Sequence, residues 1–423
     1  MNHFEYRNGI LHAEDVPLPT IAREIGTPFY CYSTATLTRH YNVFSGAFDD
    51  IPSLVCYAMK ANSNQAVLKT LAQLDCGADV VSGGELKRAL AAGIAPDKIM
   101  FSGVGKTAAE LDAGLAADIL CFNVESVPEL HALSQRAGAA GKRARVSFRI
   151  NPDVDAGTHA KISTGKKEDK FGVPWADARE IYALAATLDG IEVTGIDMHI
   201  GSQITDLDPF DRAFGRLEGL IRQLREDGHA IEHVDLGGGL GIPYRKDNMP
   251  PPDPGAYADI VKKHVRALDC RIIFEPGRLI AGNAGILVGT VIHVKQASGK
   301  AFVIGDTAMN DLIRPTLYEA WHEIMPVAEP SAGTETVTAD LVGPVCETGD
   351  YIARDRQITA MVAGDLYAIG SAGAYGAVQS GTYNTRPLVP EVLVNGNRFH
   401  VVRPRIEVEE LIAMDSIPDW LEG

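Results

Sequence analysis

Lys60 is the residue of this sequence whose position is most suggestive of covalent chemistry. It directly follows the apolar run 54–58, within Tyr57-Ala58-Met59-Lys60-Ala61-Asn62. Burial at the end of a strand disfavours the charged ammonium, so a lysine in that place can lose its proton. A neutral amine can form an imine with an aldehyde cofactor, although a lysine at a strand end is also often a solvated charge.

Two further segments place polar chemistry directly after an apolar run. Gly237-Gly238-Gly239 follows the run 231–236, and Glu275 follows the run 271–274. Successive glycines expose backbone N–H groups that suit a phosphate, but they are also common in tight turns. A carboxylate at a strand end can keep a neighbouring ring nitrogen protonated, or it can be an ordinary salt-bridge partner.

Cys346 and Arg314 are candidates of a different kind. Cys346 stands beside Glu347 in a loop rich in glycine and proline, where a thiol can donate a proton to a carbanion. Arg314 precedes Pro315, and its guanidinium can bind a carboxylate through two parallel hydrogen bonds. The simpler alternatives are a buried, unreactive thiol and a surface cation.

The elements that position these residues are predicted by an alternation of apolar runs and helical stretches from about residue 34 to 290. Repeated βα units of this kind predict a (β/α)₈ TIM-like barrel, whose catalytic residues lie at the carboxyl ends of the strands. The helical stretch 84–92 is one example of the intervening helices. The predicted strands include 54–58, 145–150, 193–199, 231–236 and 271–274.

The chain of 423 residues exceeds the roughly 250 to 300 residues over which one core grows, so two domains are expected. After about residue 290 the pattern changes to alternating strands such as 290–295 and 301–304, separated by glycine and proline turns. We therefore predict a barrel domain over 34–290. Residues 1–33, together with 291–423, are predicted to form a mostly antiparallel β domain.

Composition and charge narrow the class of protein. The formal net charge of -16 opposes binding to nucleic acid and to anionic membranes. The six cysteines form no CxxC or Cys/His cluster, so neither a metal site nor a disulfide framework is predicted. The N-terminus lacks the pattern of a signal peptide, and no apolar run approaches about 20 residues. These features predict a cytoplasmic enzyme.

Six segments in order along the chain resemble the motifs of the fold type III pyridoxal phosphate-dependent decarboxylases, which include diaminopimelate, ornithine and arginine decarboxylases. This resemblance implies an alanine-racemase-like barrel and the cofactor pyridoxal 5'-phosphate. One segment alone would be weak support, whereas an ordered set of six is highly specific. The segments are Tyr57–Asn62, Cys76–Glu85, His199–Gln203, Leu236–Gly239, Glu275–Arg278 and Gly343–Glu347.

The resemblance also assigns roles. Lys60 holds the cofactor, with Asp79 nearby; His199 stacks on its ring; and Glu275 meets the ring nitrogen, where alanine racemase has an arginine, so decarboxylation is favoured over racemisation. Cys346 donates a proton in the active site of the other subunit, which implies a homodimer with shared active sites. The phosphate is bound by Gly237, Gly238, Gly239, Ser202, Gly277, Arg278 and Tyr375.

A segment around Arg314 indicates the substrate. Met309–Tyr318, followed by Ala320 and His322, resembles the substrate-binding segment of diaminopimelate decarboxylases. The implied substrate-binding residues are Arg278, Arg314, Tyr318, Glu347 and Tyr375, with Glu347 on the distal ammonium.

The implied reaction is decarboxylation of meso-diaminopimelate at its D-centre to L-lysine and CO₂, the last step of lysine biosynthesis. Two alternatives stay open. One is a related ornithine, arginine or carboxynorspermidine decarboxylase, and the other is a non-catalytic, decarboxylase-like regulatory protein.

Overall fold

The chain divides into two compact units in the computed structural model, which describes residues 2–155, 170–245, 251–297 and 299–421. Unit 1 comprises residues 1–37, 244–246 and 281–423, and unit 2 comprises residues 38–243 and 247–280. Each unit has its own sheet and core, so each is described by itself.

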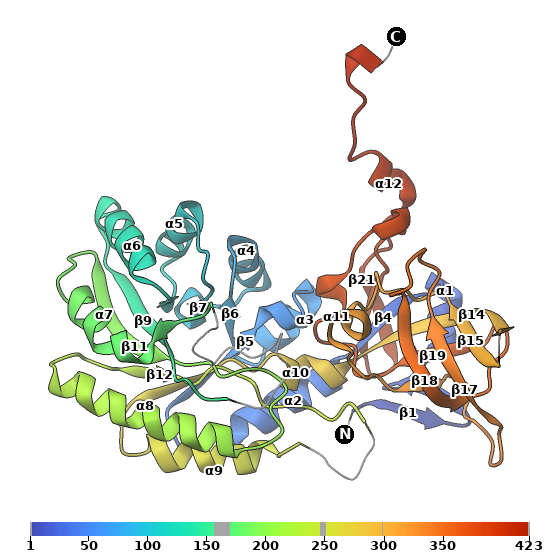
Figure 1. Ribbon diagram of the computed structural model, residues 1–423, viewed down its shortest axis with the longest axis horizontal. Helices are drawn as coiled ribbons and strands as arrows, with labels where there is room; N and C mark the ends of the chain where they lie inside the picture. The colour runs from blue at the N-terminus through green and yellow to red at the C-terminus, as the bar shows by residue number, and fades with distance from the viewer. Residues whose placement is uncertain (1, 156–169, 246–250, 298, 422–423) are drawn as a thin grey trace. The chain divides into compact units, whose positions relative to one another are not determined.

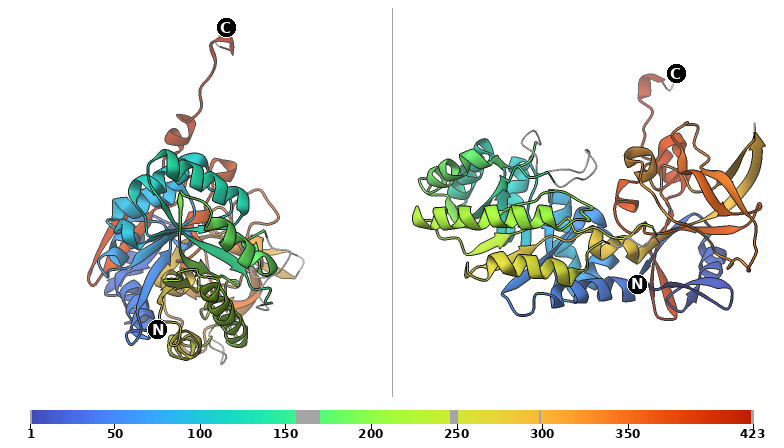
Figure 2. Two further views of the ribbon diagram at one scale, coloured as in Figure 1. Left: turned by 90° about the vertical axis from the view of Figure 1, so that its left-hand side faces the viewer. Right: turned by 60° about the horizontal axis from the view of Figure 1, so that its bottom comes forward.

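Unit 2 is a closed barrel of eight parallel strands, so the predicted barrel is confirmed (Figures 1 and 2). Neighbouring strands pair in parallel around the ring; β13 pairs with β5 and β8 pairs with β9, which closes it. The short strand β10 (Val173–Pro174) also pairs with β9. The barrel strands are β5 (Ser53–Ala58), β6 (Gly77–Val80), β7 (Ile99–Phe101), β8 (Cys121–Val124), β9 (Ala144–Asn151), β11 (Ile191–Asp197), β12 (His233–Asp235) and β13 (Arg271–Phe274).

Helices surround the strands of the barrel (Figure 2, left). Their sequences carry local start and stop signals: the Ser82 side chain caps α4 by accepting from the backbone N–H of Glu85, and Gly93 ends that helix with φ +86°. The helices are α2 (Thr34–Gly46), α3 (Gln65–Ala72), α4 (Gly83–Ala92), α5 (Ala108–Ala117), α6 (Val127–Ala139), α7 (Ala178–Ala185), α8 (Asp208–Glu226) and α9 (Pro254–Val265), followed by the short α10 (Arg278–Ala281).

The barrel strands carry an apolar cluster and then polar side chains at their carboxyl ends. The cluster consists of Leu54, Cys56, Met100, Cys121 and Ile273, all buried. Two strands end earlier than predicted, β11 at residue 197 and β12 at residue 235. Met198 and Leu236, which directly follow these ends, still donate their N–H groups to the carbonyl oxygens of Asp235 and Ile273 on the neighbouring strands, both at 3.0 Å.

Unit 1 is built on a nine-stranded, mostly antiparallel sheet and a small three-stranded antiparallel sheet of β1, β2 and β3. In the large sheet, β15 pairs with β17 and β20 pairs with β4 in parallel. The strands of unit 1 are β1 (Phe4–Arg7), β2 (Ile10–Ala13), β3 (Val16–Pro17), β4 (Phe29–Ser33), β14 (Gly285–Ala297), β15 (Lys300–Gly305), β16 (Ile324–Pro326), β17 (Thr336–Val342), β18 (Tyr351–Thr359), β19 (Leu366–Ile369), β20 (Glu391–Asn395) and β21 (Arg398–Arg403).

The helices of unit 1 are short and include α1 (Leu18–Ile25), α11 (Arg314–Tyr318) and α12 (Val408–Ile412). The core of this unit joins buried side chains from both ends of the sequence, for example Phe29 of β4, Val288 of β14 and Val392 of β20. Among the described residues of the chain, no helix is both long and apolar enough to cross a bilayer.

Candidate active site

Lys60 lies in a single 3₁₀ turn, Met59–Ala61, that begins where β5 ends. Its Nζ donates to Oδ2 of Asp79 at 3.0 Å, and Asp79 lies on the neighbouring strand β6, in register with Ala58. The Lys60 side chain is 39% exposed. The lysine is therefore partly exposed and ion-paired, and its loss of a proton to form an imine stays a prediction.

Asp79 is fully buried, and only one of its two carboxylate oxygens has a hydrogen-bond partner among the described residues. Oδ2 accepts the hydrogen bond from Lys60, whereas Oδ1 has no hydrogen-bond partner among the described residues. A buried carboxylate oxygen without a donor is costly, and such an atom at a strand end indicates a place where another polar group belongs.

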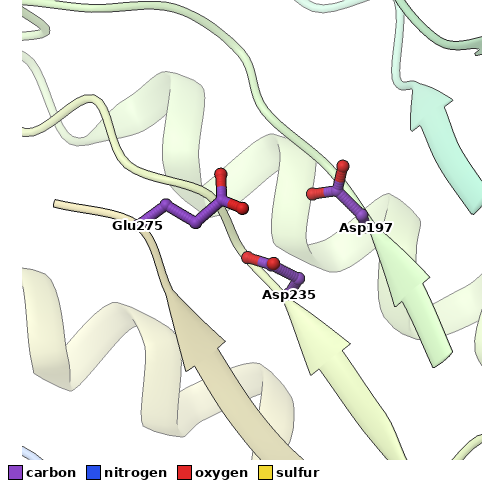
Figure 3. Close-up of side chains that lie close together, drawn as sticks. All are labelled: Asp197, Asp235 and Glu275. Carbon is purple, nitrogen blue, oxygen red and sulfur yellow. The ribbon is translucent and has the colours of Figure 1, made fainter. Parts of the chain in front are cut away.

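Three carboxyl groups meet where β11, β12 and β13 end: Asp197, Asp235 and Glu275 (Figure 3). One oxygen of each lies within 4.8 Å of the others, and all three side chains are buried. Burial is the largest cause of the raised pKa of each of the three groups. The charge of Asp235 further raises the pKa of Asp197 and Glu275. These groups therefore tend to retain protons that an exposed carboxylate would lose.

A buried amide and hydroxyl hold Glu275 in place. The Nδ2 of Asn123 lies 3.5 Å from Glu275 Oε1, 3.4 Å from Asp235 Oδ2 and 3.1 Å from Ser102 Oγ, and it donates to these oxygens. Ser102 Oγ also donates to Glu275 Oε1, at 3.4 Å. The carboxyl group at the end of β13 thus has a fixed position and a proton affinity set by its surroundings.

The glycine run 237–239 turns directly beside these carboxyl groups. Gly237 has φ +63° and donates its N–H to Asp235 Oδ1 at 2.9 Å. A Cβ at Gly238 would stand 2.3 Å from the Glu275 carbonyl oxygen, and one at Gly239 would stand 2.5 Å from the Gly201 carbonyl oxygen. Side chains are sterically excluded here, which accounts for the glycines, and the N–H groups of Gly237 and Gly238 are donated to Asp235 and His199. The phosphate role of the run stays a prediction.

His199 follows β11 and accepts a hydrogen bond at Nδ1 from the Gly238 backbone N–H, at 3.2 Å. Because that donor requires a lone pair on Nδ1, the proton of the neutral ring is on Nε2. Burial, and then the positive charges of Arg149 and Lys60, lower the pKa of His199 well below its usual value. The imidazole is therefore neutral and fixed against the glycine run.

Ser202, Gly277 and Arg278 complete the predicted set in unit 2. Arg278 Nη2 donates to Ser202 Oγ at 3.0 Å, which joins two segments of the predicted phosphate site. A Cβ at Gly277 would stand 3.0 Å from the Ala61 Cβ, so Gly277 is packed against the turn that carries Lys60. All predicted residues of the barrel therefore lie at the carboxyl ends of its strands.

The remaining predicted residues belong to unit 1. Arg314 is the first residue of α11 and is buried; Tyr318 is the last, and its hydroxyl accepts from Gln379 Nε2 at 3.4 Å. Tyr375 follows β19 and has φ +56°, which is rare for a residue with a side chain and is found preferentially at functional sites.

Cys346 and Glu347 lie on an exposed loop after β17. Asp350 organises this loop, because its Oδ1 accepts from the Met309 N–H and its Oδ2 from the Val345 N–H, both at 2.6 Å. Of the six free cysteines, Cys346 is exposed and the other five are buried. The loop therefore presents its thiol and carboxylate outward, and the role of Cys346 as a proton donor stays a prediction.

Several residues that shape these groups were not predicted: Asn123, Asp197 and Asp235 in unit 2, and Asp350 in unit 1. Asp197 and Asp235 could have been found, since each lies near the end of a predicted strand and precedes a recognised motif by one or two residues. Asn123 and Asp350 carry no such local signal, because their partners are distant in sequence.

The barrel residues fit pyridoxal phosphate. The glycine run carries no side chains that could block a phosphate, and Asp79 Oδ1 lies buried without a hydrogen-bond partner in the described part of the chain. The chemistry of the set also matches: Lys60 offers an amine to the aldehyde, Glu275 offers a carboxyl group to the ring nitrogen, and His199 offers a neutral ring.

Comparisons with known proteins agree with this fit. Residues 34–282 match the family described as "Pyridoxal-dependent decarboxylase, pyridoxal binding domain". A protein of Zymomonas mobilis named diaminopimelate decarboxylase is 51% identical over 421 residues, covering 99% of each chain. A protein of Vibrio cholerae with the same name is 52% identical over 419 residues, again covering 99% of each chain.

A solved structure gives the same result. The crystal structure of diaminopimelate decarboxylase from M. jannaschii in co-complex with L-lysine superimposes with a TM-score of 0.94, at 36% identity and with 100% of both chains covered. The fold, the strand-end residues and the full-length similarity lead to one conclusion: the chain belongs to the diaminopimelate decarboxylases, within the pyridoxal-dependent decarboxylase family.

Proposed function

We propose that this protein decarboxylates meso-diaminopimelate at its D-centre and releases L-lysine and CO₂, with pyridoxal phosphate as its cofactor. The observation that carries the proposal is the convergence of Lys60, Glu275 and the glycine run 237–239 at the carboxyl ends of the barrel strands, in a chain similar over its full length to diaminopimelate decarboxylases. When bound, the cofactor supplies the electron sink that accepts the electron pair left as CO₂ departs.

The barrel residues bind and orient the cofactor in this proposal. The backbone of Gly237, Gly238 and Gly239 lies against the phosphate in this proposal, together with Ser202, Gly277, Arg278 and, from unit 1, Tyr375. Because the N–H groups of Gly237 and Gly238 are donated to Asp235 and His199, Gly239 supplies the N–H group of the run. Burial and the neighbouring carboxylates raise the pKa of Glu275, and its carboxyl group would lie beside the ring nitrogen and keep that nitrogen protonated. His199 presents a neutral imidazole to the ring of the cofactor. Lys60, paired with Asp79, offers its amine to the cofactor's aldehyde.

The residues of unit 1 recognise the substrate. Arg314 pairs with the carboxylate of the distal centre, which a guanidinium binds better than an ammonium does, and Glu347 binds the distal ammonium. Tyr318, Tyr375 and Arg278 contribute further contacts. An ornithine-like substrate has no distal carboxylate, so Arg314 is the residue that separates these substrate classes.

Cys346 is proposed as the proton donor to the carbon that loses CO₂. Its exposure on an ordered loop makes Sγ accessible, in contrast to the five buried cysteines. We place this thiol in the active site of a second copy of the chain, so that the catalytic unit is a homodimer with shared sites. Exposed apolar side chains near the C-terminus, such as Met414 at 75% and Trp420 at 79%, support association, because a monomer would leave them in water.

Two further assignments belong to this proposal. Residues 34–290 bind the cofactor, whereas residues 1–33 with 291–423 supply the substrate contacts and the shared cysteine. The enzyme works in the cytoplasm, which is supported by the six cysteines, all of them within the described ranges and all of them free.

CO₂ release from a substrate panel tests the proposal. The purified protein, loaded with pyridoxal phosphate, is expected to release CO₂ from meso-diaminopimelate and to form L-lysine, with little release from ornithine, arginine or lysine. Turnover of ornithine without turnover of diaminopimelate would reject the substrate. Cofactor binding without any turnover in the panel would favour a regulatory protein.

A further inference from the structure

The guanidinium of Arg314 is held by two aromatic side chains of unit 1. Its Nη1 lies 2.8 Å from Nε2 of His322, and its Cζ lies 4.7 Å from the centre of the Tyr244 ring. The rings of Tyr244 and His322 meet edge to face at 5.4 Å. Arg314 is 6% exposed and His322 is fully buried. The arginine is therefore confined on one edge and one face.

The hydrogen bonds of His322 define which ring nitrogen carries the proton. Nδ1 lies 2.8 Å from the carbonyl oxygen of Gly370, which only accepts, so Nδ1 is the donor. A guanidinium only donates, so the lone pair on Nε2 accepts from Arg314. Both bonds exist together only in the neutral ring with its proton on Nδ1.

The anchor of His322 is part of the sheet. Gly370 directly follows β19, and its N–H donates to the Glu323 carbonyl oxygen at 2.8 Å, beside the β16–β19 pairing. The carbonyl oxygen of His322 accepts from Arg356 Nη2 at 3.1 Å. The imidazole is thus fixed at its backbone and at Nδ1, which makes Nε2 a stationary acceptor for the guanidinium.

We propose that His322 is a positioning residue for substrate recognition: through Nε2 it fixes the Arg314 guanidinium for the carboxylate of the distal centre. The inference rests on the proposed function, in which Arg314 binds that carboxylate. An arginine side chain loses much rotational freedom when it binds a ligand, and an arginine that is already fixed loses less. Removing the acceptor should therefore weaken binding of ligands that carry this carboxylate and spare those that lack it.

Three substitutions separate this role from simple packing. His322→Phe keeps a ring but removes both hydrogen bonds. His322→Asn retains a donor for Gly370 but is too short to accept from Arg314. His322→Gln is long enough to place an oxygen near the position of Nε2. His12→Phe, which replaces a partly buried histidine of β2 in the same unit, is the matched control.

The experiment measures KM and kcat for meso-diaminopimelate, and inhibition constants for L-lysine and for 1,5-diaminopentane, which has no carboxylate. The Phe and Asn variants are expected to raise the KM for meso-diaminopimelate and the inhibition constant for L-lysine by roughly ten-fold or more, the size of a lost hydrogen bond to a charged group. The inhibition constant for 1,5-diaminopentane should change less than about two-fold. The Gln variant should recover most of the affinity.

A thermodynamic cycle with Arg314→Ala completes the test. If His322 acts through Arg314, His322→Asn should add little to the loss caused by Arg314→Ala. Equal losses for L-lysine and 1,5-diaminopentane, or full additivity in the cycle, would overturn the inference even if the wild type decarboxylates diaminopimelate. Failure of the wild type to do so would instead reject the proposed function. If His322→Phe does not fold, the comparison of the Asn and Gln variants decides.

Discussion

Lys60 Nζ lies 3.0 Å from Asp79 Oδ2, and this ion pair joins a lysine side chain that is 39% exposed to an aspartate side chain that is fully buried. The asymmetry matters, because the aspartate depends on the lysine more than the lysine depends on the aspartate. Without Lys60, Asp79 would be a buried carboxylate that has lost its charged partner, and such a group is expensive.

We therefore expect Lys60→Ala to lower the free energy of unfolding of the cofactor-free protein by roughly 1–3 kcal/mol. Adding Asp79→Asn should recover part of the lost free energy of unfolding, because a neutral amide replaces the buried, unpaired carboxylate. Lys263→Ala, which breaks an exposed pair with Asp211, is the control and should cost about 0–1 kcal/mol. Denaturant unfolding measures all of these. A cost of Lys60→Ala that is the same in the wild type and in the Asp79→Asn variant would contradict the coupling.

The carboxyl groups at the ends of β11, β12 and β13 predict a dependence of stability on pH. Burial and the neighbouring carboxylates raise the pKa of Glu275 above its usual value. A carboxyl group with a raised pKa in the folded state binds more protons there than in the unfolded chain, so its contribution to stability is complete at low pH and is lost as pH rises through the folded pKa.

Glu275→Gln should therefore stabilise the cofactor-free protein at pH 8 relative to wild type, with a smaller difference or a reversed one at pH 4. The difference grows by about 1.4 kcal/mol for each unit by which the folded pKa exceeds the unfolded one. The same variant should lose decarboxylation, because a neutral amide cannot supply the negative charge that keeps the ring nitrogen protonated. Urea unfolding at several pH values measures the first effect. A pH-independent difference would show that Glu275 titrates normally.

The glycine run predicts a steric requirement. Gly238→Ala places a Cβ 2.3 Å from the Glu275 carbonyl oxygen, so the backbone must move and the phosphate site must open. We expect this variant to purify with much less pyridoxal phosphate than wild type, as measured by cofactor absorbance and mass spectrometry.

Gly219→Ala in α8 is the matched control for Gly238→Ala. A Cβ at Gly219 meets nothing within 4 Å, and alanine favours a helix over glycine by roughly 0.5–1 kcal/mol. The control should keep its cofactor and gain stability. Normal cofactor content in Gly238→Ala would show that the close approach at this glycine is not needed for binding.

The proposed sharing of each active site between two copies of the chain predicts complementation between two inactive variants. Lys60→Ala and Cys346→Ala should each be nearly inactive as purified homodimers. If each site takes Lys60 from one chain and Cys346 from the other, a heterodimer of the two variants contains one intact site. Random mixing of equal amounts should restore about a quarter of wild-type CO₂ release.

Denaturing and refolding the two variants together, compared with each refolded alone, provides the measurement. Absence of any recovery, with heterodimers demonstrated by mass spectrometry, would place both residues in the same chain's site. Recovery restores a signal from near zero, so loss of folding by one variant cannot imitate it.

Much of the candidate site could be predicted from the sequence because its signals are local. Lys60, Gly237 and Glu275 each follow an apolar run within a few residues, and a parallel barrel gathers all its strand ends at one rim. The order of the motifs was enough to indicate the family. Arg314 could be connected with a substrate carboxylate for the same reason, since the segment around it is a contiguous motif.

The tertiary structure decided the properties that depend on residues distant in sequence. Ser102 and Asn123 contact Glu275 although they are 173 and 152 residues away from it in the sequence, so no local pattern predicts these contacts. The partial exposure of Lys60 was also not predictable, because the exposure of a side chain depends on which segments pack around it in the folded chain. Sequence determines which groups are available and which strands they follow. The exact strand ends, the proton affinities and the orientation of side chains are set by burial and by neighbours that only folding brings together.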